Sequence, residues 1–349
     1  GGGLLGVLVA GTPFIGMEAA PFLVVVSLAY ASAHMLRNVQ VKKKYWFRFF
    51  GAGIIAILVL AGSQWGEGGS VDLQQALRFL GAVLFSGGLV LLGLPLWERF
   101  FDVLSPLRLT ELSHPSSPLL KRLQVEAPGT YHHSLMVGTL AEVAAENIGM
   151  DGAFVKAGAL YHDVGKLRRP QFFIENQQYG SVNAHDELSP TLSALVIISH
   201  VRDGYELSME YGIPRKIRQF IMEHHGTTCL QYFQKKAESL GERVSREQFS
   251  YPGPAPRSKE TALVMLADSV EAAIRADSHT VSRITDLEET IHGVVENKIK
   301  EKQLENVDFT FRELEIIKKS FGEVMRSMYH SREIPKKEEL SSLQGKENI

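Results

Sequence analysis

The chain has 349 residues, and its 37 Lys and Arg residues nearly balance its 39 Asp and Glu residues, which gives a formal net charge of −2. A chain so close to neutral has no bulk electrostatic attraction for a nucleic acid polymer, so we expect no partner of that class. Cys229 is the only cysteine, which excludes an intrachain disulfide framework and fits a reducing compartment.

The first 97 residues have the composition of a membrane region. Four stretches are apolar almost throughout, at 4–15, 21–36, 49–65 and 79–97. The last three approach the roughly 20 apolar residues that a spanning helix needs, and Trp46, Trp65 and Trp97 lie at their ends, as interfacial anchors do. We therefore expect residues 1–97 to be transmembrane helices, the C-terminal half of a polytopic bundle that is cut from a longer protein. A buried helical hairpin of a soluble protein is the weaker alternative, because these runs lack a polar face.

Charge asymmetry predicts how this region is oriented. The loop at 37–48 is rich in Lys and Arg, whereas the loop at 67–72 (EGGSVD) is acidic. Because basic loops stay in the cytoplasm, the chain is expected to return there after Trp97. The sequence thus predicts a multi-pass protein of the cell membrane whose remaining residues are cytoplasmic.

The rest of the chain is predicted to be helical, and no segment shows strand-like alternation, so the expected fold class is all-α. Residues 98–120 contain Pro106, Pro115 and Pro118 and are predicted to be a juxtamembrane connector. A cytosolic domain is expected over 121–332, with an insertion at about 229–258, and a disordered charged tail over 333–349. Helices are expected at 119–126, 137–148, 153–164, 190–200, 213–221, 231–242, 259–276, 282–302 and 310–329.

The stretch 153–166 (AFVKAGALYHDVGK) carries the first chemical signal. Its apolar residues share one helical face, and Gly165 then offers a helix stop. His162 and Asp163 are predicted to lie at the end of this helix. An imidazole next to a carboxylate offers a nitrogen ligand and an anionic oxygen ligand that can bridge two cations. Taken alone, such a pair is weak evidence, because a surface Asp beside a partly buried His is the ordinary alternative.

Further candidate ligands occur at or next to the apolar faces of other expected helices. Burying polar groups without partners costs a few kcal/mol each, and shared coordination of a metal offsets that cost. The full set is His133, His162, Asp163, His200, His224, His225 and Asp268. In this order, H…HD…H…HH…D, the set resembles the HD-domain metal-dependent phosphohydrolases.

Longer strings sharpen the resemblance: LLKRLQVEAPGTYHHSLMVG, YHDVGKLRRPQFFIENQ, LSPTLSALVIISHVRDG, EHHGTT and YPGPAPRSKE. They are similar to the membrane-anchored, seven-transmembrane HD phosphodiesterases, the PgpH-like family that degrades cyclic di-AMP. The resemblance covers almost the whole chain, and it implies that an external domain and further helices lie upstream. It also implies that one metal is held by His133, His162, Asp163 and Asp268, and a second by Asp163 as a bridge with His200, His224 and His225. Imidazole and carboxylate ligands without thiolates suit two Mn²⁺ or Fe²⁺ ions.

The activity that the resemblance implies is hydrolysis of cyclic di-AMP to linear pApA. Two cations polarise the phosphoryl group and supply a hydroxide that attacks phosphorus in line. Asp163 and Lys166 are the expected catalytic residues. Contacts to the substrate are expected from Lys166 and Arg169 at phosphates, from His132, and from Asn176 and Tyr251 around a purine. The structural alternatives are a lysine that faces helix carbonyls and a solvated basic turn.

Other functions are kept open. The alternative substrates are cyclic di-GMP, whose HD enzymes carry a GYP signature where this chain has YGIP and YPGP, and hyperphosphorylated guanosine nucleotides. A non-hydrolysing nucleotide-binding membrane receptor and a structural membrane scaffold are alternatives of another class. The expected partners are a cyclic dinucleotide and the lipid bilayer, and a homodimer is one open alternative for the oligomeric state.

Overall fold

The computed structural model describes residues 74, 98, 104–177, 182–276 and 284–330. The chain divides into two compact units, Gly1–Leu112 and Ser113–Ile349. The helices predicted to span a membrane at 1–97 and the tail predicted at 333–349 lie outside the described residues, apart from 74. Among the described helices, none combines the length and the apolar character needed to cross a bilayer.

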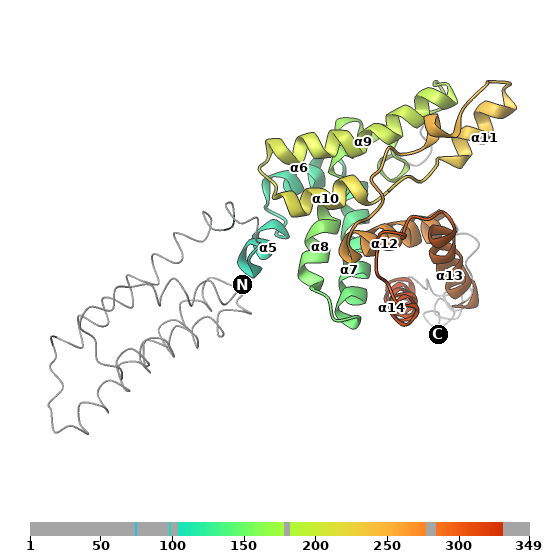
Figure 1. The fold of residues 1–349 in the computed structure, drawn as a ribbon. Coiled ribbons are helices and arrows are strands. Elements are labelled where there is room, and N and C mark those ends of the chain that lie inside the picture. The colour runs from blue at the N-terminus through green and yellow to red at the C-terminus, as the bar shows by residue number, and fades with distance from the viewer. Residues whose placement is uncertain (1–73, 75–97, 99–103, 178–181, 277–283, 331–349) are drawn as a thin grey trace, which may run out of the picture. The chain divides into compact units, whose positions relative to one another are not determined.

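The described part of the chain is helical (Figure 1). In the first unit it contains α5 (Pro106–Leu112). In the second unit it contains α6 (Pro118–Glu126), α7 (Pro128–Asn147), α8 (Gly152–Tyr161), α9 (Pro190–Glu210), α10 (Arg215–Glu223), α11 (Gln231–Ser239), α12 (Lys259–Ala276), α13 (Ile284–Lys300) and α14 (Phe311–His330). Four 3₁₀ helices join them: η1 (Val164–Arg168), η2 (Pro170–Phe172), η3 (Ile174–Asn176) and η4 (Arg246–Phe249). Extended pairing within the described residues amounts to one isolated bridge between Cys229 and Ser250. For the part of the chain that the structure describes, the predicted all-α class is confirmed.

Local capping explains several helix ends. The Ser189 Oγ accepts a hydrogen bond from the Leu192 amide at 3.2 Å, and Pro190 follows as the first residue of α9, as predicted. The predicted helix at 259–276 is observed as α12. Helix α9 continues to Glu210, ten residues beyond the predicted end at His200. It runs through Gly204, where a Cβ atom would lie 3.0 Å from the Gly165 amide nitrogen, so the glycine allows η1 to approach α9 closely.

The prediction of one helix over 153–164 with Gly165 as its stop is wrong in where the helix ends. Helix α8 ends at Tyr161, His162 is its C-cap residue, and the chain continues as the 3₁₀ helix η1. Gly165 does not stop α8; instead it lies against α9, where a Cβ atom would overlap the carbonyl oxygen of His200. The break between α8 and η1 turns Asp163 inward, where it is 1% exposed.

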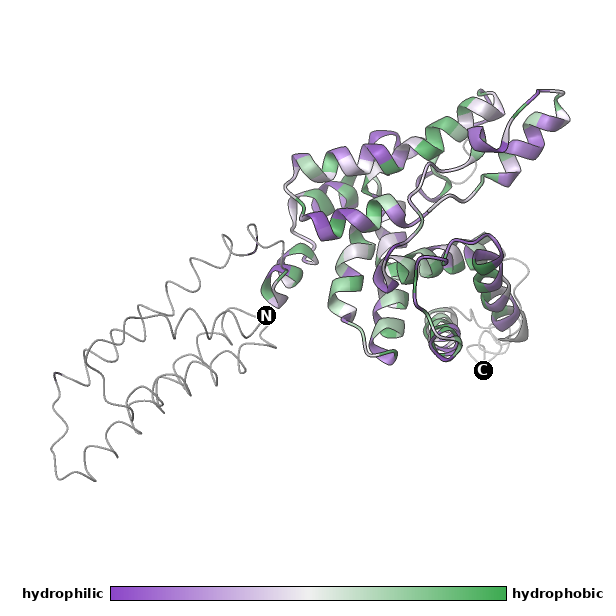
Figure 2. Ribbon diagram, in the orientation of Figure 1, coloured by the Kyte–Doolittle hydropathy of each residue, from purple (hydrophilic) through white to green (hydrophobic). Residues whose placement is uncertain are grey.

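The main hydrophobic core is built from α7, α8, α12, α13 and α14, with Phe220 of α10 packed on it. It includes Leu140 on α7, Val155 on α8, Leu266 on α12 and Phe321 on α14, all fully buried. Figure 2 colours α7 and α8 white to green, whereas α11 is largely purple. Each fully buried side chain of this size contributes about 1.5–3 kcal/mol. This core therefore holds α7 and α12, which carry His133 and Asp268, in a defined relation.

The segment after His225 packs on α9 through α11 and η4. Its small cluster of buried residues includes Cys229, Ala237 and Phe249. A buried carboxylate ties the far end of this segment to α10, because the Glu223 Oε2 accepts hydrogen bonds from the Arg257 amide at 3.0 Å and the Thr261 hydroxyl at 2.7 Å. The segment thus closes over the end of α10, where the two adjacent histidines lie.

Candidate metal centre

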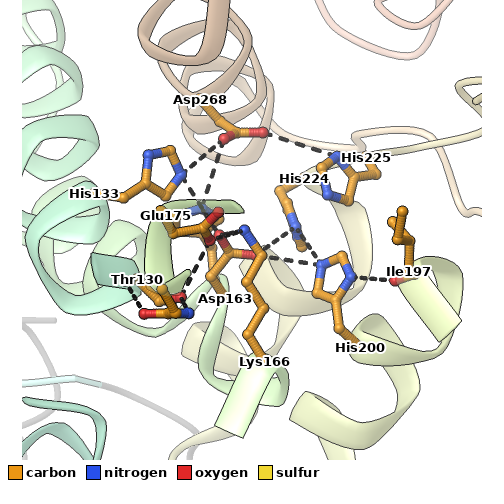
Figure 3. Close-up of polar contacts among 12 residues, drawn as sticks. Thr130, His133, Asp163, Lys166, Glu175, Ile197, His200, His224, His225 and Asp268 are labelled. Carbon is orange, nitrogen blue, oxygen red and sulfur yellow. Dashed lines mark hydrogen bonds and ion pairs between the residues drawn. The ribbon is translucent and has the colours of Figure 1, made fainter. Parts of the chain in front are cut away.

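All seven side chains predicted as ligands come together in the second unit. Figure 3 labels each of them except His162. They form two groups in which the ligand atoms lie within 4.8 Å of one another: His133, His162 and Asp268, and Asp163, His200, His224 and His225. The first group comes from α7, the end of α8 and α12; the second comes from α9, the end of α10 and the α8–η1 break.

Asp163 lies between the two groups, and its two oxygens face different ones. Its Oδ2 is 3.5 Å from the His133 Nε2 and 3.2 Å from the His162 Nε2. Its Oδ1 is 3.3 Å from the His200 Nε2 and 3.6 Å from the His224 Nε2. A carboxylate in this position can bind one cation through each oxygen.

The second carboxylate, Asp268, belongs mainly to the first group. Its Oδ1 is 3.0 Å from the His133 Nε2 and 3.8 Å from the His162 Nε2. Its Oδ2 turns to the other side, 3.8 Å from the His225 Nδ1. The His225 side chain is 23% exposed, whereas those of the other four histidines are buried.

Four of the five histidines are oriented by a hydrogen bond from Nδ1. The Nδ1–H of His162 donates to the Ala159 carbonyl at 2.6 Å, that of His200 to the Ile197 carbonyl at 2.6 Å, and that of His224 to the Ile221 carbonyl at 2.9 Å. His133 differs, because its Nδ1–H donates to the Glu271 carboxylate at 2.7 Å. Each of these bonds leaves Nε2 as the nitrogen with a free lone pair, which is the form that binds a metal.

The residues fit a pair of cations. The His162 Nε2 and the Asp163 Oδ1 are buried and have no hydrogen-bond partner among the described residues. The Nε2 atoms of His200 and His224 face each other at 3.3 Å, although Nδ1 of each ring is already the donor. Buried polar atoms left in this state cost free energy, and divalent cations shared by imidazoles and carboxylates remove that cost.

The carboxylates of the first group and Glu271 raise the pKa values of its two histidines. Burial alone would lower the pKa of His162, but the charges and hydrogen bonds of Asp163 and Asp268 together raise it to about 10. Burial also lowers the pKa of His133, but the hydrogen bonds to Asp268 and Glu271 outweigh burial, so the pKa of His133 is raised above its usual value. Without metal, the first group therefore carries protons that a cation must displace.

The second group behaves in the opposite way. Burial lowers the pKa of His224 to about 4. Burial, together with the neighbouring His224, lowers the pKa of His225 well below its usual value. These two rings are neutral at pH 7, which is the state in which imidazole binds a cation.

Lys166 lies beside the bridging carboxylate. Its Nζ is 2.7 Å from the Asp163 Oδ2 and 2.7 Å from the Glu175 Oε1 (Figure 3). The Thr130 hydroxyl also donates to the Glu175 Oε1, at 3.1 Å. Burial opposes the charged ammonium, but the charges of Asp163 and Glu175 raise the pKa of Lys166 above its usual value. Lys166 is thus a cation held at the edge of the candidate metal centre.

Two of the residues predicted to bind substrate are engaged in structural contacts. The Asn176 side chain accepts from the Thr130 amide at 3.1 Å and donates to the Thr130 hydroxyl at 2.8 Å. Arg169 donates to the Asp203 carboxylate at 3.1 Å and is exposed. Both contacts attach the segment after Asp163 to a helix, and neither reaches a candidate ligand.

The other two predicted contacts lie in different surroundings. His132 is exposed, although it adjoins a candidate ligand in sequence. The buried Tyr251 ring stacks on His225, with centroids 4.2 Å apart and planes 25° apart, and meets His200 edge-on at 6.0 Å. Tyr251 therefore forms a wall behind the second group of histidines.

Sequence reasoning did not single out two carboxylates of the site. Glu271 follows Asp268 by three residues on α12, a spacing that places both on one face of a helix and could have been noticed. Glu175 is next to Asn176, which is the residue predicted to contact the substrate. No spacing in the sequence points to Glu175. The sequence contains a second His-Asp pair, His185 and Asp186, which is in neither group, and the His185 Nε2–H donates to the Phe172 carbonyl.

Comparisons with known proteins agree with this geometry. The family model for the HD domain matches residues 130–273, a stretch that contains all seven candidate ligands. The chain is 43% identical over 250 residues to the cyclic-di-AMP phosphodiesterase PgpH of Bacillus subtilis, covering 71% of this chain and 35% of that protein. It is 40% identical over 263 residues to PgpH of Listeria monocytogenes, covering 74% of this chain and 36% of that protein. The chain thus spans about a third of the length of these curated relatives.

Solved structures lead to the same family. The crystal structure of the L. monocytogenes PgpH HD domain matches with a TM-score of 0.58 and 41% identity, over 61% of this chain and 99% of that one. The same domain in complex with cyclic-di-AMP matches with a TM-score of 0.59 and 40% identity, over 62% of this chain and 100% of that one. The chain therefore belongs to the HD-domain family, and the PgpH cyclic-di-AMP phosphodiesterases are among its relatives.

Proposed function

We propose that the chain is a metal-dependent phosphodiesterase that hydrolyses cyclic di-AMP to linear pApA. The observation that carries the proposal is the position of Asp163, whose two oxygens face two separate groups of imidazoles. The relatives named as cyclic-di-AMP phosphodiesterases and the related domain in complex with cyclic-di-AMP support the choice of substrate.

In this proposal the two groups hold two divalent cations, Mn²⁺ or Fe²⁺, with Asp163 shared between them. The cations supply Lewis acidity for the phosphoryl oxygens and lower the pKa of a coordinated water. The histidines present Nε2 in fixed orientation, because backbone carbonyls and Glu271 hold their Nδ1 atoms. Since the ligand side chains other than His225 are buried, they are already desolvated before a cation arrives.

Lys166 supplies a fixed positive charge next to the reacting phosphate. It is attached to Glu175 as well as to Asp163, so it keeps one anionic partner when Asp163 turns its oxygen to a cation. A charge-assisted hydrogen bond from an ammonium to a phosphate oxygen is stronger in a site that excludes water. We propose that Lys166 binds the scissile phosphate and stabilises the charge that develops on it.

The remaining substrate contacts are proposals that rest on the resemblance. Arg169 would meet the second phosphate after releasing Asp203, and Asn176, Tyr251 and His132 would line the path of an adenine. Tyr251 has the best support of these, because its ring already lies against His225 and His200.

We also propose the arrangement along the chain: transmembrane helices over 1–97, a connector over 98–120, a cytoplasmic HD domain over 121–332 and a charged tail over 333–349. The apolar stretches and the basic loop at 37–48 support it. Extraction of cell membranes with carbonate tests it, because a multi-pass protein stays in the pellet and a peripheral one is released.

The activity is tested with the full 349-residue chain in a mild detergent. The protein is stripped of metal with a chelator, part of it is restored with Mn²⁺, and both samples are given cyclic di-AMP, cyclic di-GMP and a hyperphosphorylated guanosine nucleotide. We expect linear pApA, followed by chromatography, from the restored sample alone. Binding of cyclic di-AMP without product would indicate a receptor, and the absence of stoichiometric metal would indicate a scaffold. Faster turnover of a guanine nucleotide would replace the proposed substrate.

A further inference from the structure

His133 differs from the other candidate ligands in how its ring is held. Its Nε2 faces the Asp268 Oδ1 at 3.0 Å, and its Nδ1 donates to the Glu271 Oε2 at 2.7 Å. Both carboxylates come from α12, three residues apart, so one helix holds the imidazole at its two nitrogens. The other oriented histidines donate Nδ1–H to a neutral backbone carbonyl three residues earlier in their own helix.

Glu271 is buried at this contact. It is 6% exposed, and His133 is 2% exposed. Apart from His133 itself, the cationic partner of Glu271 among the described residues is Arg275, whose Nη1 is 3.7 Å from the same carboxylate oxygen and whose side chain is 35% exposed. A buried carboxylate with so little compensation is costly unless its hydrogen bond to His133 is made, so the pair orients the ring strongly.

The first group therefore contains more negative charge than the second. The first group has the carboxylate of Asp268, the Oδ2 of Asp163 and, hydrogen-bonded to His133, the carboxylate of Glu271. The second group has three imidazoles and the Oδ1 of Asp163. Carboxylates that hydrogen-bond a ligand histidine fix its tautomer, and removing them typically costs about 10–100-fold in metal affinity.

We propose that Glu271 is a positioning residue that makes the His133, His162 and Asp268 group the tighter of the two metal sites. It acts through His133, by keeping the Nε2 lone pair directed at the cation and by placing a negative charge behind the ring. The inference rests on the two-cation site proposed above. Because the first group binds its cation more tightly, it fills before the second.

The test isolates each site by removing one ligand from the other. The full chain is purified in detergent with His200→Ala, which leaves the first group intact, and with His162→Ala, which leaves the second intact. Each background is combined with Glu271→Gln, which keeps the shape and an acceptor but removes the charge, and with Glu271→Ala. Mn²⁺ affinity is measured by chelator competition, and bound Mn²⁺ is followed by electron paramagnetic resonance.

We expect Glu271→Gln to weaken Mn²⁺ binding about 10–100-fold in the His200→Ala background, with a larger loss for Glu271→Ala. In the His162→Ala background neither change should alter the affinity. The matched control is Glu142→Gln, which removes a carboxylate of the same helix as His133 that is paired with Lys156 at 2.7 Å, far along α7 from the candidate ligands. It should leave both affinities unchanged.

Thermal unfolding of the metal-free variants separates positioning from folding. A purely structural role of Glu271 would lower the melting temperature and leave the affinity of the folded protein the same, which overturns the inference. Equal losses in the two backgrounds, or a loss confined to the His162→Ala background, would overturn it as well. If the wild-type chain binds two Mn²⁺ and hydrolyses cyclic di-AMP while Glu271→Gln binds identically, the inference alone fails. If the wild-type chain binds no Mn²⁺, the proposed function fails with it.

Discussion

The two halves of the candidate metal centre are positioned by different parts of the fold. His133 and Asp268 lie on α7 and α12, whose apolar faces build the main core. His200 and His224 lie on α9 and at the end of α10, and the segment 229–258 covers them with Tyr251. The first half is thus placed by burial of many apolar side chains, the second by the approach of α9, the end of α10 and the segment that covers them.

The difference extends to chemistry. The first half is rich in carboxylates and has raised histidine pKa values, whereas burial keeps His224 and His225 neutral in the second half. Asp163 joins the halves, since it sits where α8 gives way to η1 and Gly165 lets η1 contact α9 closely. A two-metal site can therefore be assembled from one half that attracts cations by charge and another that offers neutral nitrogen, provided one carboxylate reaches both.

The largest effect is expected from removing that shared carboxylate. Asp163→Ala should abolish stoichiometric binding of both cations and lower hydrolysis of cyclic di-AMP by at least about 10⁴-fold, because each cation supplies several kcal/mol of charge stabilisation. Metal analysis and product chromatography measure the two effects. The control is Asp186→Ala in the second His-Asp pair, which lies in neither group. A variant that loses only one cation would mean that Asp163 belongs to one half.

Removal of a ligand from the second half should abolish cation binding there and leave the cation of the first half bound. His200→Ala is expected to bind one Mn²⁺ in place of two and to lower hydrolysis about 10²–10³-fold, because one Lewis acid remains. The metal content of the dialysed protein is the readout. His292→Ala, an exposed histidine of α13 that contacts Lys318, serves as the control. Loss of both cations in His200→Ala would contradict independent halves.

Lys166 offers a test that leaves both halves filled. Lys166→Met should keep two Mn²⁺ and lower kcat about 10²-fold, since it removes a positioned charge at the reacting phosphate. Steady-state kinetics at saturating Mn²⁺ measure this change. Lys156→Met, on α8 and paired with Glu142, is the matched control. A fall in metal content that matches the fall in rate would indicate that Lys166 orients Asp163 and does not contact the substrate.

Proton release should distinguish the halves by charge. The raised pKa of His162, about 10, means that the metal-free first half carries a proton on this ring at pH 7, and the pKa of His133 is raised as well. Mn²⁺ must displace such protons, so binding should release protons and weaken about tenfold per pH unit for each proton displaced as the pH falls below that value. Titration in weakly buffered solution with a pH indicator measures the release. Binding without proton release would contradict the pairing of these histidines with carboxylates.

The smallest expected effect concerns the helix that carries His200. Ser189→Ala removes the side-chain cap of α9 and should lower the free energy of unfolding by about 1 kcal/mol. The Mn²⁺ affinity of the first half should not change, because α9 supplies none of its ligands. Denaturant unfolding of the metal-free chain is the measurement, with Ser239→Ala, whose hydroxyl donates within the last turn of α11, as the control. An equal loss in both variants would mean that the cap contributes nothing specific.

The sequence alone indicated the seven candidate ligands and much of the helical frame. His133 and Asp268 could be predicted because helical periodicity puts them beside apolar stripes that must be buried, and α12 begins and ends where the pattern predicts. The pair His224 and His225 could be predicted for the same reason, since it continues the stripe that ends α10. The helical repeat is a local property of the sequence, so it predicts which residues face the core without knowledge of which elements pack against them.

Only the tertiary structure decided how those residues are oriented and what supports them. The break after Tyr161 was missed, because it depends on contact between Gly165 and the His200 carbonyl, which are far apart in sequence. The roles of Glu175 and Glu271 were missed for a related reason: each acts on a partner supplied by another element, Lys166 from η1 in one case and His133 from α7 in the other. Spacing along one helix shows which side chains share a face, but which atoms they meet is decided by the packing of that face against the rest of the core.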